Sequence, residues 1–390
     1  MIYTFEIDST KYFFDGNSLQ LYKDFFPEES VSAPIKAETS NILKKAVFNV
    51  ANVCNGQCIY CYEKGGNFGR PNAIMDREAA DKVLNIIFRE YDHVELASFF
   101  GGEPTLNYKI IQYIVNELEK RSFVSGYEIT TNAINMDDDM IAFFIKNNFK
   151  VIISIDGPEV IHNQLRRNCT HKKVEEVIQK LKESTIGSLM ELNCTYTKLH
   201  EESLSYDELI RYFENLGVKY HISNVITDIE CLRLSETHKS EKEYIDDAYE
   251  NLAAKALNVE IPGTVKNIIQ ALVRREYKNK FCYGLCHGNR AVFDCYGEQF
   301  PCEALLYECK IDDPRISLYN EKSGEACSKC WAKGLCSHCT ADFILGRAPI
   351  PYKDGECNKK ELYGYALKKL VSYYHREPEK FQTILDNYYS

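Results

Sequence analysis

Between residue 46 and about residue 225 the sequence alternates stretches typical of β-strands with stretches typical of α-helices. Strand candidates rich in apolar and β-branched residues lie at 47–53, 94–100, 127–131, 151–155, 190–197 and 219–225. The segments between them carry apolar residues at three- and four-residue spacing, as amphipathic helices do, at 76–91, 108–120, 137–147, 173–182 and 206–216. This alternation predicts βαβ units around a parallel sheet. Six units favour a partial, TIM-like (β/α)6 barrel in an α/β protein, and a doubly wound open sheet is the alternative.

The segments outside residues 46–225 differ in composition and in predicted secondary structure. Residues 1–45 predict a small β-rich segment with strands near 2–7, 11–14 and 19–22, and residues 226–281 predict a bridging helical segment. Residues 282–358 are rich in cysteine and poor in periodicity, so we expect metal rather than an apolar core to hold them together. Residues 359–390 predict a C-terminal helix. The barrel is assigned to residues 46–225.

Composition narrows the class of protein. The apolar fraction of 45% and the charged fraction of 27% are those of a globular protein. No run of eighteen apolar residues could span a bilayer, and the first residues lack the basic and apolar regions of a secretory signal. The net charge of −10 disfavours a nucleic-acid backbone as the main partner. We therefore expect a cytoplasmic protein without a membrane or nucleic-acid partner.

The 16 cysteines are unevenly placed: three lie between residues 54 and 61 and ten between residues 282 and 357. In a reducing compartment closely spaced cysteines are more often metal ligands or redox centres than disulfides. Cys54, Cys58 and Cys61 form a C-x3-C-x2-C pattern directly after the first barrel strand. Three thiolates without a fourth nearby would leave one iron of an iron–sulfur cluster open to a small molecule. A zinc site is the alternative, although zinc sites usually pair two C-x2-C units.

This pattern resembles the signature of the radical S-adenosylmethionine (SAM) superfamily, C-x3-C-x-aromatic-C, with Tyr60 at the aromatic position. The resemblance implies that the three cysteines hold a [4Fe–4S] cluster and that SAM chelates its fourth iron. It also implies that Tyr60 packs near the adenine. An electron from such a cluster cleaves SAM to a 5′-deoxyadenosyl radical, which abstracts hydrogen from a substrate. The cofactor would supply this chemistry and the protein would position it.

Further matches to the superfamily follow in the expected order. Gly101-Gly102-Glu103-Pro104 follows the second strand, where the family's GGEP receives the SAM amino group. Asn132 ends the third strand, Ser154 ends the fourth, and Arg166 follows; in related enzymes the serine and the arginine reach the SAM ribose and carboxylate. Each residue alone could be a surface or capping group. Together most lie at the carboxyl ends of successive strands, where α/β barrels keep their active sites.

The second cysteine region resembles the SPASM extension of radical SAM enzymes. Cys286 and Cys302 match its first part, with Gly297 between them, and the rest of its pattern falls on Cys327, Cys330, Cys336, Cys339 and Cys357. The spacing between Cys336 and Cys339 is two residues, whereas the family has three, and this shifts the direction in which Cys339 points. Zinc-ribbon-like sites are the alternative. Of the remaining cysteines, we expect five to be small buried apolar residues: Cys169, Cys194, Cys231, Cys295 and Cys309.

Carried over by position, the resemblance implies two auxiliary iron–sulfur clusters. A distal cluster would be held by Cys327, Cys330, Cys336 and Cys357. A proximal cluster would be held by Cys286, Cys302 and Cys339, with Cys282 as a possible fourth ligand. A closed proximal site would suit electron transfer, and an open one could bind a substrate thiolate.

SPASM enzymes mostly modify peptides or proteins, and residues 61–69 and 99–107 resemble maturases of short cysteine-rich peptides (ranthipeptide maturases). This implies thioether crosslinks from cysteine sulfur to carbon, a cysteine-rich precursor peptide as partner, and a flavodoxin or ferredoxin as electron donor. Alternatives are carbon–carbon or ether crosslinking, an anaerobic sulfatase maturase with Glu303 near the clusters as a base, or a non-enzymatic electron carrier. About 45 residues precede the barrel, so we expect no full leader-binding domain. The strands of residues 1–22 either accept a peptide strand at an edge or only cap the barrel.

Overall fold

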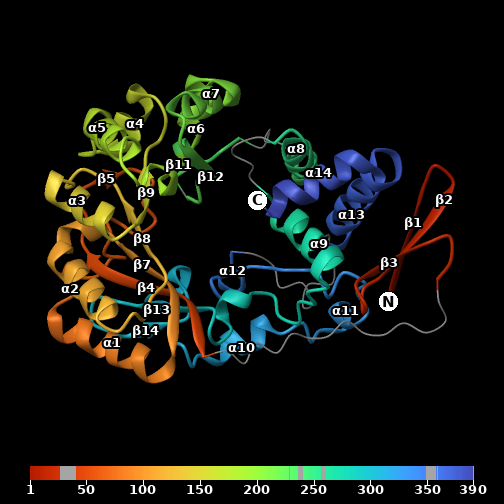
Figure 1. The fold of residues 1–390 in the computed structure, drawn as a ribbon, viewed down its shortest axis with the longest axis horizontal. Helices are drawn as coiled ribbons and strands as arrows, with labels where there is room; N and C mark the ends of the chain where they lie inside the picture. Colours follow the sequence, from red (N-terminus) through yellow and green to blue (C-terminus); the bar gives the residue numbers. More distant parts are fainter. Residues whose placement is uncertain are drawn as a thin grey trace. The chain divides into compact units, whose positions relative to one another are not determined.

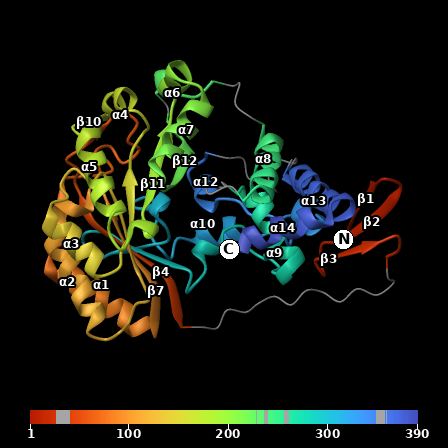
Figure 2. The same cartoon turned by 45° about the horizontal axis from the view of Figure 1, so that its top comes forward.

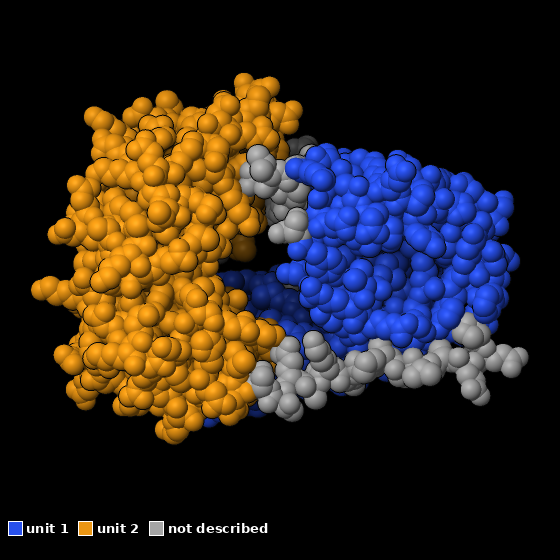
Figure 3. Space-filling view, viewed as in Figure 1, with its two compact units in different colours: residues 1–39, 239–283, 312–390 blue, residues 40–238, 284–311 orange. Residues whose placement is uncertain are grey.

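The computed structural model describes residues 1–26, 41–227, 229–235, 240–255, 261–347, 357 and 359–389. It divides into two compact units, which Figure 3 shows in different colours. Unit 1 comprises residues 1–39, 239–283 and 312–390, and unit 2 comprises residues 40–238 and 284–311. Part of the cysteine-rich segment, residues 284–311, therefore groups with the barrel strands.

Unit 2 is built on six parallel strands that adjoin in chain order. They are β4 (Ile42–Asn52), β7 (His93–Gly101), β8 (Tyr127–Thr131), β9 (Lys150–Ser154), β11 (Glu191–Tyr196) and β12 (Lys219–Asn224). The main connecting helices are α1 (Arg77–Glu90), α2 (Tyr108–Glu119), α3 (Asp138–Lys146), α5 (His171–Lys182) and α7 (Tyr206–Leu216). Figures 1 and 2 show these helices along the outer side of the curved sheet. The predicted partial (β/α)6 barrel is confirmed.

Local sequence explains where these elements begin. Helix α1 begins after Asp76, whose side chain accepts a hydrogen bond from Ala79 N at 2.8 Å. Helix α7 has a capping box in which Ser205 and Glu208 satisfy each other's free backbone N–H groups. The inner part of β4 is an unbroken run of buried residues, as expected for a strand covered on both faces.

Two further strands continue the sheet beyond β4: β13 (Arg290–Phe293), which is parallel to it, and β14 (Gln299–Phe300).

Unit 1 combines a three-stranded meander with a group of helices. The meander is β1 (Ile2–Ile7), β2 (Thr10–Asp15) and β3 (Gln20–Lys23), paired antiparallel in that order. The long helices are α8 (Glu241–Ala253), α9 (Gly263–Arg274), α13 (Lys359–Arg376) and α14 (Pro378–Tyr389). Phe14, Tyr249, Ile268 and Leu367 share one apolar core, which joins the meander to these helices. Short helices carry the rest of the cysteine-rich segment: α10 (Pro314–Asn320), α11 (Glu325–Ser328) and α12 (Thr340–Ile344).

Among the described helices, none combines the length and the apolar character that crossing a membrane requires.

Candidate functional site

The loop after β4 carries the first three cysteines. Cys54 is the second residue beyond β4, and Cys58 lies in the short strand β5 (Gln57–Cys58). This strand pairs antiparallel with β10 (Arg166–Arg167), so that Cys58 faces Arg166 across the ladder. A turn in which Cys61 N donates to Cys58 O at 3.1 Å then returns the chain. All three cysteines are half-buried and lie at the carboxyl end of a barrel strand.

Glycines allow two other loops to approach these cysteines. A Cβ on Gly66 would lie 2.3 Å from Gly102 Cα and 3.3 Å from the Cys54 Cβ, and Gly66 has a φ of +90°. Gly102 N donates to Ala51 O at 2.8 Å, which fixes the GGEP backbone beside the end of β4. Side chains at either glycine would separate the loops. The structure therefore brings the GGEP segment against the cysteine loop.

Cys169 is a component of this site that the sequence did not reveal. Its side chain is buried, and a Cβ on Gly56 would lie 2.8 Å from the Cys169 Sγ and 3.4 Å from the Cys54 Sγ. The Cys169 thiol also hydrogen-bonds to Cys58. More than a hundred residues separate Cys169 from the loop, so no spacing pattern could have linked them.

The surroundings of Cys54 and Cys58 shift the pKa values of their thiols in opposite directions. Burial raises the pKa of the Cys54 thiol to about 12, and the neighbouring Glu103 charge adds to this. The hydrogen bond from Cys169 acts against burial, and together with the Arg166 charge it lowers the pKa of the Cys58 thiol to about 7. Thiolates are the form that binds metals, and a metal ion deprotonates a coordinating thiol outright. The donor set therefore fits an iron–sulfur cluster, with Cys58 the most readily ionised ligand.

Glu103 is buried at the end of β7, where it caps the turn that begins with Pro104. Its Oε1 accepts hydrogen bonds from Thr105 Oγ1 at 2.6 Å and Thr131 Oγ1 at 2.7 Å, and its Oε2 accepts one from Asn132 N at 2.7 Å. Burial raises the pKa of this carboxyl, while these hydrogen bonds lower it. Glu103 thereby joins the ends of β7 and β8.

Asn132 connects Glu103 to the cysteine loop. Its Nδ2 donates to Asn55 Oδ1 at 2.8 Å and lies 3.7 Å from the Cys54 Sγ. Ser154 is half-buried at the end of β9, the strand next to β8. The predicted residues at the ends of β7, β8 and β9 therefore lie along one edge of the sheet, as the sequence indicated.

Arg166 is held by Asp156, a residue for which no role was predicted. The Arg166 guanidinium donates to both carboxylate oxygens of Asp156, at 2.8 and 3.2 Å, and Tyr60 Oη donates to Asp156 Oδ2 at 2.5 Å. Asp156 is fully buried, and Arg166 Nη1 lies 3.8 Å from the Cys58 Sγ. Asp156 thus positions both Tyr60 and Arg166 beside Cys58. Its place two residues after Ser154, at the end of the fourth predicted strand, is the signal that could have identified it.

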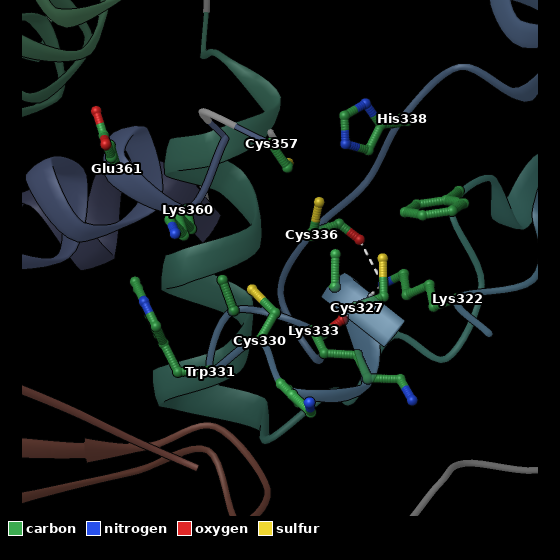
Figure 4. A pocket seen from close by; sticks show the side chains of 14 residues that line it. Lys322, Cys327, Cys330, Trp331, Lys333, Cys336, His338, Cys357, Lys360 and Glu361 are labelled. Carbon is green, nitrogen blue, oxygen red and sulfur yellow. Dashed lines mark hydrogen bonds between the residues drawn. The ribbon is translucent and has the colours of Figure 1, made fainter. Parts of the chain in front are cut away.

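A second cysteine group lies within unit 1. A cavity of about 600 Å³ is lined by the four cysteines expected to hold the distal cluster: Cys327, Cys330, Cys336 and Cys357. Figure 4 shows their side chains around one space, close to Lys322 and Trp331. Within the described ranges, no three cysteine, histidine or carboxylate side chains are arranged as ligands of a single metal ion. The four thiols share the wall of one cavity.

Lys322 forms part of the cavity wall although nothing in the sequence marks it. Its side chain is 3% exposed, and burial lowers its pKa to about 8. A buried cation beside four cysteines would offset part of the negative charge of their thiolates.

The four cysteines expected to hold the proximal cluster belong to different units. Cys282 and Cys339 lie in unit 1, where Asn320 connects their neighbourhoods. Its Oδ1 accepts from Cys282 N at 2.7 Å and from Thr340 Oγ1 at 3.0 Å. Cys286 and Cys302 lie in unit 2, so the proximal ligand set stays a prediction.

Comparisons with known proteins agree with this geometry. The model of the radical SAM superfamily matches residues 48–213. An uncharacterized protein of Methanocaldococcus jannaschii is 28% identical over 269 residues, covering 67% of this chain and 86% of its own. A cysteine-type anaerobic sulfatase-maturating enzyme of Clostridium perfringens is 26% identical over 178 residues, 43% of this chain and 47% of the relative. A radical SAM cyclopropyl synthase of Paramaledivibacter caminithermalis is 24% identical, and the match covers 49% of this chain and 42% of that protein.

The fold agrees with that of a solved structure. The structure of anSMEcpe with bound AdoMet superimposes with a TM-score of 0.60 at 20% identity, covering 88% of this chain and 99% of that one. The chain thus shares the partial-barrel fold of that structure. Residues 48–213 match the radical SAM superfamily, and this match supports an enzyme that uses SAM and that superfamily's [4Fe–4S] cluster. The chain spans about half the length of the sulfatase-maturating relative that it matches.

Proposed function

We propose that this protein is a radical SAM peptide maturase in which Cys54, Cys58 and Cys61 hold the SAM-cleaving cluster. One observation carries the proposal. The cysteine loop is assembled together with the GGEP backbone, Glu103 and Asn132 at the carboxyl edge of the barrel. Three local thiols without a fourth in the motif suit a cluster with one open iron.

The chain's own residues would orient the cofactors. When bound, the cluster and SAM supply the 5′-deoxyadenosyl radical. Gly101 and Gly102 let the GGEP backbone lie against β4 and the cysteine loop. Glu103, whose Oε2 retains acceptor capacity beside the bond from Asn132 N, would receive the SAM amino group. Asp156 holds Arg166 and Tyr60 in place, which reduces the entropy lost when SAM binds. Pro104 and Ser154 would complete the pocket at neighbouring strand ends.

We further propose two auxiliary iron–sulfur clusters. The cavity in unit 1 supports the distal one, because its wall combines the four predicted thiols with a buried cation. The proximal one would take Cys286, Cys302 and Cys339, with Cys282 as the fourth ligand. A flavodoxin or ferredoxin would supply the electrons.

The reaction we propose is thioether formation in a ribosomally made cysteine-rich peptide. The radical would remove hydrogen from a carbon of the peptide, a cysteine thiolate would bond to that carbon, and an auxiliary cluster would take up the remaining electron. Similarity to sulfatase-maturating enzymes and to a cyclopropyl synthase supports a peptide or protein substrate. The strands of residues 1–22 could receive the peptide at β1 or β3, the edges of the meander.

Sulfatase maturation is the second candidate, because relatives named for it match part of this chain. The carboxylate considered as its base, Glu303, accepts a hydrogen bond from Arg290 Nη1 at 2.7 Å. Glu303 would have to leave this ion pair to reach a substrate proton, so the sulfatase reaction rests on the similarity to those relatives.

The test is anaerobic co-expression with a short cysteine-rich peptide encoded beside the enzyme, followed by alkylation and mass spectrometry. Thioether formation predicts the loss of two hydrogens per bond and one fewer alkylatable thiol each time. Loss of hydrogen with all thiols free would indicate carbon–carbon or ether chemistry. An unchanged peptide, together with formylglycine in a co-expressed sulfatase, would establish the second candidate.

A further inference from the structure

We infer that Lys322 is a positioning residue that compensates the charge of the distal auxiliary cluster and raises its reduction potential. The inference rests on the proposed function, because it assumes a cluster on Cys327, Cys330, Cys336 and Cys357. It assigns a role to a side chain that is no ligand. Three observations within unit 1 carry it.

The first observation is the hydrogen bonding of the ammonium group. Lys322 Nζ donates to three backbone carbonyls, Lys278 O at 2.6 Å, Lys333 O at 2.7 Å and Cys336 O at 2.5 Å. A protonated amine has three N–H donors and no acceptor, so three carbonyls match the charged form. A neutral amine would turn its lone pair towards a carbonyl oxygen. The three acceptors therefore match the protonated form of the side chain.

The second observation is the absence of a compensating carboxylate. Within the part of the chain that the structure describes, no aspartate or glutamate pairs with Lys322, which is 3% exposed. Glu361 lines the same cavity, but Figure 4 shows it on the far side from Lys322. A buried charge without a partner is strongly unfavourable. The thiolates and the cluster that they hold would supply the missing negative charge.

The third observation is the place of the three carbonyls. Lys333 and Cys336 belong to the loop that carries two predicted ligands, and the same loop is fixed by Cys336 N donating to Ala332 O at 2.8 Å. Lys278 comes from the segment after α9, and its N donates to Gly334 O at 2.8 Å. Lys322 therefore ties the ligand loop to a neighbouring segment and keeps its charge at the wall of the cavity.

The expected effect follows from electrostatics. Reduction adds one electron to the cluster, and a nearby cation favours the reduced state. The effect is large for a buried charge and small for an exposed one, because water and salt screen the latter. Cluster potentials respond to charge and hydrogen bonding in this way. Removing the Lys322 charge should lower the potential of this cluster.

The experiment isolates the distal site in the full chain. The parent variant carries alanine at the three ligands of the SAM-cleaving cluster and at two of the proximal ligands: Cys54, Cys58, Cys61, Cys286 and Cys302. After anaerobic reconstitution, its iron content and an EPR-monitored redox titration are compared with those of Lys322→Met, Lys322→Gln and Lys322→Arg. The matched control is Lys329→Met. It removes the same charge from the same cavity, but the Lys329 side chain is 74% exposed and pairs with Glu325.

We expect a shift to more negative potential in both neutral Lys322 variants, and little change in Lys322→Arg and Lys329→Met. The Lys322→Gln side chain keeps two N–H donors for the carbonyls. It therefore tests the loss of charge even if Lys322→Met does not fold. Folded neutral variants that lose the iron, while Lys322→Arg retains it, would also support the charge role. An unchanged potential in the neutral variants, or equal iron loss in all three, would overturn it. A parent without iron would instead contradict the proposed auxiliary cluster.

Discussion

Arg166 lies directly opposite Cys58 in a two-residue antiparallel ladder, and its guanidinium reaches within 3.8 Å of the Cys58 Sγ while it binds both oxygens of Asp156. One side chain thus links the second cysteine of the motif to the end of β9. The link depends on residues more than a hundred positions apart. Breaking this link should change two measurable quantities, the free energy of unfolding and the iron content after reconstitution.

Replacing Arg166 with alanine leaves Asp156 as a buried carboxylate without its cation. Breaking a buried ion pair on one side costs about 3–5 kcal/mol. We therefore expect Arg166→Ala to lower the free energy of unfolding by that amount, measured by urea denaturation of the apo-protein. The neighbouring Arg167→Ala is the control, because Arg167 is exposed, and it should change stability by less than about 0.5 kcal/mol. Equal effects of the two variants would contradict this account of Asp156.

Gly56 should be intolerant of a side chain because of Cys169. A Cβ at Gly56 would lie 2.8 Å from the Cys169 Sγ, and overpacking of this kind costs about 1–3 kcal/mol. Gly56→Ala should therefore reduce the iron content after reconstitution of the cysteine loop. The double variant Gly56→Ala/Cys169→Ala removes the clash and should recover much of that iron. If the iron lost in the double variant equals the sum of the losses in Gly56→Ala and Cys169→Ala, the two residues do not interact.

Glu103→Gln tests the carboxylate that accepts hydrogen bonds from Thr105, Thr131 and Asn132. An amide offers one acceptor oxygen in place of two, so a buried donor loses its partner at a cost of about 1–3 kcal/mol. We expect weaker SAM binding to the reconstituted protein by calorimetry. Glu95→Gln is the control, since Glu95 is on the same strand but exposed. SAM affinity unchanged in Glu103→Gln would remove Glu103 from the proposed pocket.

Glu128 should make stability depend on pH. Burial alone would raise the pKa of its carboxyl, but Lys45, at 2.7 Å, together with Ser98 and Lys150, holds the pKa below its usual value. A lowered pKa in the folded state stabilises the protein above the unfolded pKa of about 4.3. This contribution is lost as pH falls through the folded value. The stability difference between wild type and Glu128→Gln should therefore shrink below pH 4 in urea titrations, and a difference independent of pH would contradict the pairing.

The regular elements were largely predictable from periodicity. Strand β8 and helix α7 have the predicted limits, because strong apolar patterns end there in turn or capping residues. Strand β4 begins at Ile42, earlier than expected, since the consecutive Lys44 and Lys45 interrupt the apolar pattern of its first residues. The short helices α4 (Glu159–Leu165) and α6 (Lys198–Ser203) were not predicted, because two turns are too short to show a helical period.

Motif spacing predicted the residues of the cysteine loop but not the groups that support it. Asp156, Cys169 and Lys322 act through contacts made only after distant segments pack together. A single buried lysine or cysteine has no sequence context that distinguishes it from the many others in the chain. Identifying such residues requires the folded geometry.

The central claim is that Cys54, Cys58 and Cys61 hold a cluster that cleaves SAM. The direct measurement is chromatography of 5′-deoxyadenosine formed by the anaerobically reconstituted, dithionite-reduced protein in the presence of SAM. We predict at least one equivalent per chain from the wild type and none from Cys58→Ala. Wild-type protein with full iron content that forms no 5′-deoxyadenosine, or a Cys58→Ala variant that forms as much as the wild type, would contradict the claim.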